Sequence, residues 1–269
     1  MQTEQKNKFR LTEGSYYSRT ANEIFMSASQ FKSFRKCQAC ALAELRGEYV
    51  QPKTTALLVG SYVDAAFEGP HAFEEFCMKN PDIFKKDGNL KSEFAKALDI
   101  IERVHNQPFM MECLSGEKQK IMTGEIAGVR FKIKIDSYRP GIMIADLKCM
   151  KDFDDIYIEE QGRVPWYQGW GYDVQGAIYR EIVRQNTGEV LPFVIVGVTK
   201  EPVSDMDVIE IPSEYLDYEL ERVKKEAPLY AALKSGLFEP ERCGACNYCK
   251  STKVIKGVRN PESEEDFFN

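Results

Sequence analysis

The fold is decided by residues 133–150, which read IKIDSYRPGIMIADLKCM. Ile133 and Ile135 alternate with polar residues, which is the period-two pattern of a half-buried strand. An Arg-Pro-Gly triplet then supplies turn chemistry, and a second apolar run follows it. The stretch therefore predicts two β-strands joined by a tight turn. Asp136 lies near the end of the first strand and Asp146 lies on the second.

The polar side chains of this hairpin suit metal-dependent hydrolysis of a phosphodiester. Asp146 and Lys148 are two residues apart on one strand, so their side chains share a face. Together with Asp136 they would place two carboxylates and an ammonium in one cleft. Carboxylates suit Mg²⁺ or Mn²⁺, and such an ion lowers the pKa of a bound water. The alternative is an ordinary exposed ion pair on a surface hairpin, so the hypothesis depends on the other motifs of the chain.

A helix with polar groups on one face is predicted for residues 172–188. Its apolar residues recur at helical spacing, and Gly188 suits its C-terminal end. Gln175 and Tyr179 are four residues apart and share a face, and Tyr172 lies about one turn earlier. An amide and a phenol on that face could contact the carboxylates and the DNA backbone. The alternative is a helix whose Gln and Tyr are partly buried against a sheet.

The ordered motifs resemble those of the PD-(D/E)XK nuclease superfamily, and in particular of RecB-like and phage RecE-type exonucleases. These families carry D, (D/E)-x-K and Q-x-x-x-Y motifs in that order, which correspond here to Asp136, Asp146-Leu147-Lys148 and Gln175-x-x-x-Tyr179. Gly60 begins a segment that falls where they have G-x-x-x-H, with Asp64 in place of the usual His. The resemblance covers roughly residues 24 to 250.

The resemblance implies a fold, an activity and roles for these residues. The fold is α/β, with a mixed central sheet flanked by helices in a restriction-endonuclease-like core. The activity is that of a Mg²⁺- or Mn²⁺-dependent DNA exonuclease of phage or prophage recombination or of DNA repair. The ligands assigned to the metal are Asp64, Asp136, Asp146 and the backbone carbonyl of Leu147. The residues assigned to catalysis are Asp136, Asp146, Lys148, Gln175 and Tyr179.

The charge of the chain restricts how it can contact DNA. A formal net charge of −6 argues against broad nonspecific coating of DNA but does not exclude a local basic groove. Lys132 and Lys134 share the face of Asp136 and, with Tyr172, are the predicted DNA contacts. An ordinary solvated face is the alternative for the two lysines. The resemblance also implies a single-strand annealing protein as a partner, and self-association, because related exonucleases form toroidal oligomers.

The cysteines carry a second signal. Three of the eight lie close together as C-x₂-C-x₂-C, at Cys243, Cys246 and Cys249, a spacing that suits an iron–sulfur cluster or zinc. The best fourth ligand is Cys37, and Cys40 competes with it. The run that ends at Cys37 resembles the S-x-L-x-x-F-x-x-C segment of iron–sulfur RecB-like nucleases, of the AddB type and of CRISPR adaptation. There, one early and three late cysteines clamp the two ends of the domain, so we expect an iron–sulfur cluster, with zinc as the alternative.

Length and composition agree with a single domain. A chain of 269 residues can bury a substantial core, and no apolar run approaches the ~20 residues that span a membrane. The start, MQTEQKNKFR, is polar and shows no signal peptide, which favours a reducing cytoplasm. We expect a flexible N-terminal segment at 1–20, a single nuclease domain with the cysteine cluster at 21–252, and an acidic tail at 253–269.

Caps and periodicity predict the remaining elements. One helix is expected to begin at Ser27 or Ser29 and to run to about Arg46. Further helices are predicted over 55–67, 90–106 and 213–235, a three-stranded meander over 117–149, and a buried strand over 191–200.

Two other functional classes stay open at this point. One is a catalytically silent DNA-binding module that keeps the nuclease fold, for which Asp64 in the usual His position is the motive. The other is a structural metal protein in which the cysteines matter and the Asp-x-Lys motif is incidental.

Overall fold

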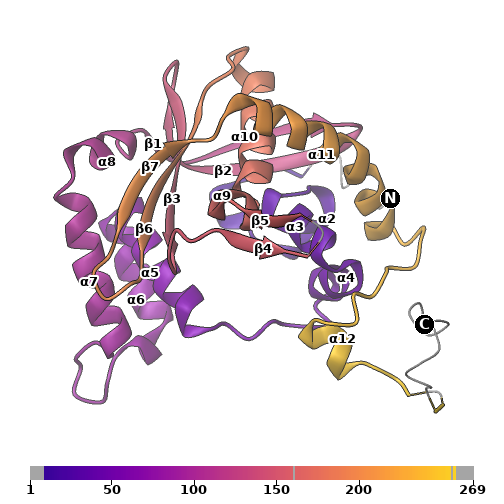
Figure 1. Ribbon diagram of the computed structural model, residues 1–269, viewed down its shortest axis with the longest axis horizontal. Helices are drawn as coiled ribbons and strands as arrows, with labels where there is room; N and C mark the ends of the chain where they lie inside the picture. Colours follow the sequence, from indigo (N-terminus) through magenta and orange to yellow (C-terminus); the bar gives the residue numbers. More distant parts are fainter. Residues whose placement is uncertain (1–8, 160, 256, 259–269) are drawn as a thin grey trace.

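A five-stranded mixed sheet forms the centre of the computed structural model, which describes residues 9–159, 161–255 and 257–258 (Figure 1). The strand order is β1-β2-β3-β6-β7. The strands are β1 (Glu117–Ile126), β2 (Val129–Arg139), β3 (Met143–Met150), β6 (Phe193–Thr199) and β7 (Met206–Glu210). Neighbours are antiparallel except β3 and β6, which run parallel and are therefore joined by a long crossover. The predicted α/β class with a mixed sheet is confirmed.

The hairpin predicted from residues 133–150 is present. β2 ends at Arg139 and β3 begins at Met143, and the Ile142 N–H donates to the Arg139 carbonyl over 3.0 Å. Gly141 has a φ of 71°, a left-handed conformation that residues with a side chain rarely adopt. With β1, the hairpin completes the predicted meander.

Helices cover both faces of the sheet and enclose two apolar cores (Figure 1). The helices are α2 (Arg19–Ile24), α3 (Ala28–Lys36), α4 (Gln38–Arg46), α5 (Thr55–Glu68), α6 (Pro70–Lys79), α7 (Ser92–His105), α8 (Pro108–Cys113), α9 (Trp166–Gly169), α10 (Tyr172–Thr187), α11 (Ser213–Lys234) and α12 (Asn247–Ser251). Two 3₁₀ turns, η1 (Glu13–Ser15) and η2 (Pro81–Ile83), and a small hairpin of β4 (Ile156–Ile158) and β5 (Gly162–Val164) complete the described elements.

Strand alternation divides the apolar residues between these two cores. Ile144 of β3 packs with α3, α10 and α11, whereas Leu147 packs with α5, α7 and α8 on the opposite face. All seven residues of β6 are buried, as expected for a strand that is covered on both sides. The crossover helix α10 thus lies on the face of β3 to which Asp146 and Lys148 also point.

One predicted helix is in fact two. The expected helix from Ser27 or Ser29 to Arg46 is broken at Cys37, which has the extended dihedrals φ −164° and ψ 107°. Ser27 does cap the first helix, because its hydroxyl accepts the Gln30 N–H over 3.2 Å. The other predicted helices and the strand at 191–200 agree with the structure to within a few residues.

The chain ends are described in part. Residues 1–8 and most of the predicted acidic tail lie outside the described residues. Within the predicted N-terminal segment, η1 and the first turn of α2 are formed and Tyr16 is 6% exposed, so this part is packed against the domain. The proposed boundaries at 20/21 and 252/253 stay predictions. None of the helices in the described part of the chain has the length and apolarity that crossing a bilayer would require.

Candidate active site

β2 and β3 separate where the polar residues of the hairpin begin. Next to the turn they pair, the last pair being Ser137 with Ala145. Beyond this pair the carboxylate of Asp136 lies between the strands and accepts the Leu147 N–H over 3.1 Å. The β1–β2 ladder skips Asp136 and its neighbour Gln119, which has the left-handed φ of 53°. This local irregularity turns Asp136 toward β3, as bulges often do beside active sites.

Helix α10 holds both strands of the split hairpin. The Gln175 amide donates to Asp146 Oδ1 over 2.7 Å, and the Tyr179 hydroxyl donates to the Lys134 carbonyl over 3.0 Å. Both side chains are buried. These two bonds are how the Q-x-x-x-Y motif would support the site. Gln175 fixes a carboxylate of β3, and Tyr179 donates to a carbonyl of β2 at the point where β3 no longer pairs with it. Contact of either residue with DNA stays a prediction.

The predicted site residues of three elements meet in one cleft of about 510 Å³. Asp136 comes from β2, Asp146 and Lys148 come from β3, and Asp64 comes from α5. Asp146 is buried, and its Oδ2 forms an ion pair with the half-buried Lys148 ammonium. Asp64 is exposed to the cleft. The ordered motifs thus converge in space, although they are spread over 85 positions from Asp64 to Lys148.

The cleft concentrates negative charge at its base. Loss of hydration and the neighbouring Asp146 carboxylate raise the pKa of Asp136 to about 8, against the opposing effect of Lys148. Restricted hydration also raises the pKa of Asp64 to about 7, with Asp146 adding to the rise and Lys148 opposing it. Burial alone would lower the pKa of Lys148, but the carboxylates of Asp146 and Asp136 raise it above its ordinary value. The carboxylates of Asp64, Asp136 and Asp146 thus all lie within electrostatic range of the Lys148 ammonium.

These groups fit a divalent cation. Carboxylate oxygens are the donors that Mg²⁺ and Mn²⁺ prefer. Asp146 is buried, with its Oδ1 accepting from the Gln175 amide and its Oδ2 paired with the Lys148 ammonium, so the carboxylate is held in a fixed position at the cleft. The carboxylates do not meet as closely as the four thiolates described below, since mutual repulsion opposes a tighter arrangement.

The three predicted DNA contacts differ in their surroundings. Lys132 is 1% exposed, and its ammonium contacts the Tyr16 carbonyl and Asn22 Oδ1, the latter at 2.7 Å. Lys132 lines the cleft but its charge is used inside the protein, so DNA contact by Lys132 stays a prediction that these contacts do not favour. Lys134 lines the cleft, with its ammonium 3.9 Å from a Glu68 carboxylate oxygen.

Tyr172 lies close to two ammonium groups, one of which the sequence did not assign to the site. The Nζ atoms of Lys32 and Lys148 are each 5.3 Å from the centroid of the Tyr172 ring. Burial lowers the pKa of Lys32 to about 8, and the like charge of Lys148 adds to this effect. Lys32 and Tyr172 are 140 positions apart, so their contact could not be recognised from the sequence.

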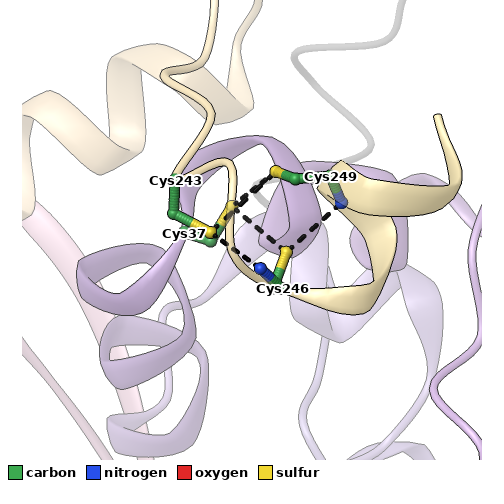
Figure 2. A group of neighbouring side chains, drawn as sticks. All are labelled: Cys37, Cys243, Cys246 and Cys249. Carbon is green, nitrogen blue, oxygen red and sulfur yellow. Dashed lines mark hydrogen bonds between the residues drawn. The ribbon is translucent and has the colours of Figure 1, made fainter. Parts of the chain in front are cut away.

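The cysteine cluster is formed by Cys37, Cys243, Cys246 and Cys249 (Figure 2). Their sulfur atoms all lie within 4.8 Å of one another. The Sγ–Sγ distances from Cys249 are 3.6 Å to Cys37 and 3.9 Å to Cys243, and Cys246 is 3.8 Å from Cys37. Cys40 is buried nearby but is not part of this group. The break between α3 and α4 explains the choice, because the extended backbone at Cys37 directs its thiol toward the C-terminal segment.

Backbone groups complete this cluster. The Cys246 N–H donates to the Cys243 sulfur and the Cys249 N–H donates to the Cys246 sulfur, each over 3.4 Å. Nearby, the Ala39 N–H donates to the Glu241 carbonyl over 3.0 Å. The C-terminal segment is thus joined to the N-terminus of α4 both by thiols and by the main chain, which is the predicted clamp between two distant parts of the sequence.

Comparison with known proteins gives two matches. A family model described as "PDDEXK-like domain of unknown function (DUF3799)" matches residues 27–252. A crystal structure from Eubacterium rectale, whose protein is named "Putative exonuclease", is similar with 42% sequence identity and a TM-score of 0.90 over 94% of this chain and 97% of that chain. No curated protein matches. The match to the family model confirms the resemblance inferred from the motifs.

Proposed function

Because the chain belongs to the family of PDDEXK-like domains, DUF3799, we propose that it is a metal-dependent deoxyribonuclease that removes nucleotides from DNA ends. The observation that carries this proposal is the convergence of Asp136, Asp146 and Lys148 at the split between β2 and β3. The exonuclease preference rests on the motif order and on the name of the similar protein from Eubacterium rectale. A role in phage recombination or in DNA repair rests on the motif resemblance, as does an annealing partner or a ring-shaped oligomer.

The residues of the cleft would have three roles: metal ligands, a lysine that acts on the water and the phosphate, and side chains that hold the two strands in place. Asp136, Asp146 and Asp64 would hold Mg²⁺ or Mn²⁺, with the Leu147 carbonyl as a further ligand. When bound, the ion supplies charge neutralisation at the scissile phosphate and acidifies a water molecule. The Lys148 ammonium would orient the attacking water and stabilise negative charge that develops on the phosphate. Gln175 and Tyr179 keep the two strands at their spacing.

A cleavage assay with several forms of DNA tests the proposal. Linear duplex, linear single-stranded and covalently closed circular DNA are incubated with Mg²⁺, with Mn²⁺ and without divalent cation. An exonuclease degrades linear DNA only in the presence of the ion and spares the closed circle. Cutting of the circle would identify an endonuclease. Binding of DNA without cleavage under every condition would instead identify a silent DNA-binding module.

Asp64→Asn tests the third carboxylate. The amide removes one negative charge from the site and is a poorer ligand for Mg²⁺. We therefore expect the Mg²⁺ concentration for half-maximal cleavage to rise roughly tenfold or more, within the range seen when groups around a metal are changed. Part of the activity should return at high Mn²⁺. Asp99→Asn, at an exposed position of α7, is the matched control. An unchanged Mg²⁺ dependence in Asp64→Asn would remove position 64 from the metal site.

For the cysteine cluster we propose a single zinc ion. Four thiolates around zinc, with bonds of ~2.3 Å, stand ~3.8 Å apart at tetrahedral geometry. Three of the separations are 3.6, 3.8 and 3.9 Å and all of the separations lie within 4.8 Å, which agrees with that spacing. An iron–sulfur cluster places iron and sulfide between its thiolates and so holds them further apart. The spacing therefore favours zinc over the iron–sulfur cluster expected from the sequence pattern.

A further inference from the structure

An exposed aromatic ring stands at the active-site cleft. Tyr17 is 73% exposed, although it lines the same cleft as Asp64 and Asp136. Reduced hydration of its phenol, together with the negative charges of Asp136, Glu68 and Asp64, raises the pKa of Tyr17, so the hydroxyl lies within electrostatic range of these carboxylates. A ring placed in this way contributes little to the core and presents most of its surface to whatever enters the cleft.

The ring is held from below by a second tyrosine. Tyr16 is buried, and its ring meets that of Tyr17 edge to face, with centroids 5.0 Å apart and an interplanar angle of 81°. The Lys134 ammonium lies 5.2 Å from the centroid of the Tyr17 ring. Tyr17 is thus an ordered side chain on a packed support.

The buried Lys132 fastens this support to the sheet. Its ammonium contacts the carbonyl oxygen of Tyr16, lies 4.5 Å from the centroid of the Tyr16 ring and binds Asn22 Oδ1 at 2.7 Å. Burial lowers the pKa of Lys132 to about 8, which reflects the cost of removing its charge from water. A methionine at this position of β2 would avoid that cost, so the lysine calls for a reason beyond packing.

The charges around Tyr17 select for a neutral group. Asp64 and Asp136 face this wall as proposed ligands of the metal, and Glu68 adds a carboxylate that the metal site does not use, so a neutral base suits the position beside Tyr17 better than a second phosphate. The Lys134 ammonium beside the Tyr17 ring is 3.9 Å from a Glu68 carboxylate oxygen, whereas the ammonium groups of Lys32 and Lys148 lie at Tyr172. A DNA strand that keeps its phosphates near those lysines can offer a nucleobase to the Tyr17 ring. A base within an intact duplex is stacked on both faces, so only an unpaired base can do this.

We propose that Tyr17 stacks on an unpaired nucleobase beside the scissile phosphate, and that Lys132 is the positioning residue that holds Tyr17 in place. The inference rests on the proposed nuclease function and adds the substrate class: single-stranded DNA, or a DNA end whose terminal nucleotides have separated. Blunt duplex DNA would have to fray before it could use this contact.

Binding of labelled oligonucleotides tests the stacking contact. Fluorescence anisotropy is measured in the Asp146→Asn background, so that the strand stays intact. Tyr17→Ala should weaken binding of a single strand by roughly tenfold, as loss of one stacked base does, and should affect a blunt duplex much less. Tyr17→Phe should bind as Tyr17 does, because the ring remains. Tyr218→Ala is the matched control: Tyr218 is 64% exposed on α11 and also has a cation near its ring, Arg222 at 5.9 Å.

Combination of the variants tests the positioning role. Lys132→Met should weaken single-strand binding as Tyr17→Ala does, and the double variant should show no further loss, because both changes remove one contact. Fully additive losses would show that Lys132 acts on binding independently of Tyr17 and would overturn the positioning role. Thermal unfolding of each variant identifies any that does not fold, in which case Tyr17→Ala and Tyr17→Phe decide the stacking contact.

Steady-state kinetics separate this inference from the proposed function. In the otherwise native chain, Tyr17→Ala should raise KM for single-stranded DNA while kcat changes little. An active protein in which Tyr17→Ala alters neither binding nor KM would overturn the stacking contact. Equal losses on single-stranded and blunt duplex DNA would overturn the substrate class. A chain that never cuts DNA but loses single-strand affinity with Tyr17→Ala would disprove the nuclease proposal and support the stacking contact.

Discussion

Asp146→Asn is expected to lower the rate of DNA cleavage by a factor on the order of 1000, which corresponds to about 4 kcal/mol of transition-state stabilisation. Asp146 would contribute to the metal site and is also the partner of both the Gln175 amide and the Lys148 ammonium. An asparagine can still accept from Gln175, but its NH₂ group would then face the ammonium. The substitution therefore weakens the cation site and displaces Lys148 in one step.

The fold should tolerate this change. Removal of one carboxylate relieves repulsion with Asp136 and Asp64, whose pKa values are both raised by crowding and loss of hydration. We expect the unfolding temperature to stay close to that of the native chain. Cleavage of labelled linear DNA and thermal unfolding are measured side by side, with Asp99→Asn as the control. Cleavage at the native rate by Asp146→Asn would disprove the catalytic assignment of the Asp-x-Lys motif.

Cys246→Ser is expected to lower the unfolding temperature by about 10 °C or more. Structural zinc contributes on the order of 10 kcal/mol to the folding of small metal domains, and a loss of even 3–5 kcal/mol shifts the unfolding temperature of a chain of this size by roughly that amount. Three thiolates and a hydroxyl bind the ion less well than four thiolates. The effect should be one of stability, because the cluster lies outside the cleft that holds Asp146.

Metal analysis and thermal unfolding check this prediction together. Protein purified without oxygen should contain about one zinc ion per chain and be colourless. Iron with a visible absorption band would restore the iron–sulfur assignment. Cys77→Ser is the matched control, since Cys77 is partly buried in α6 and lies outside the cluster. The clamp does not stabilise the fold if the native chain holds neither metal and Cys246→Ser unfolds at the same temperature as the native chain.

Local patterns predict the framework of this protein well. The alternation around Ile133 and the turn at Gly141 reflect interactions between neighbours in sequence, and so do the shared faces of Gln175 with Tyr179 and of Asp146 with Lys148. The relevant spacings, two residues on a strand and four on a helix, are properties of the backbone itself.

The remaining features depend on contacts between distant residues. The alternation along its strand places Lys132 on the same face as Asp136, which predicts a side chain in the cleft. Its burial depends instead on Tyr16, which lies 116 residues earlier in the sequence. Cys37 and Cys40 are separated by about one helical turn, so spacing alone could not decide between them. The helix break at Cys37 is what makes Cys37 the fourth member of the cluster, and this break occurs where Cys37 contacts the C-terminal segment. The left-handed Gln119 likewise has no local signal, because residues of its type rarely adopt that conformation.

The cysteine cluster has a consequence for the order of events during synthesis. Cys37 and Cys249 are 212 residues apart, so the first ligand leaves the ribosome long before the last. Until then Cys37 lacks its three partner thiols, while the sheet strands that lie between it and those partners are still being made. If the cluster holds the proposed zinc ion, its capture by all four thiols has to follow synthesis of the central sheet. Supply of the metal would then limit how quickly newly made chains mature, even where their catalytic clefts are already assembled.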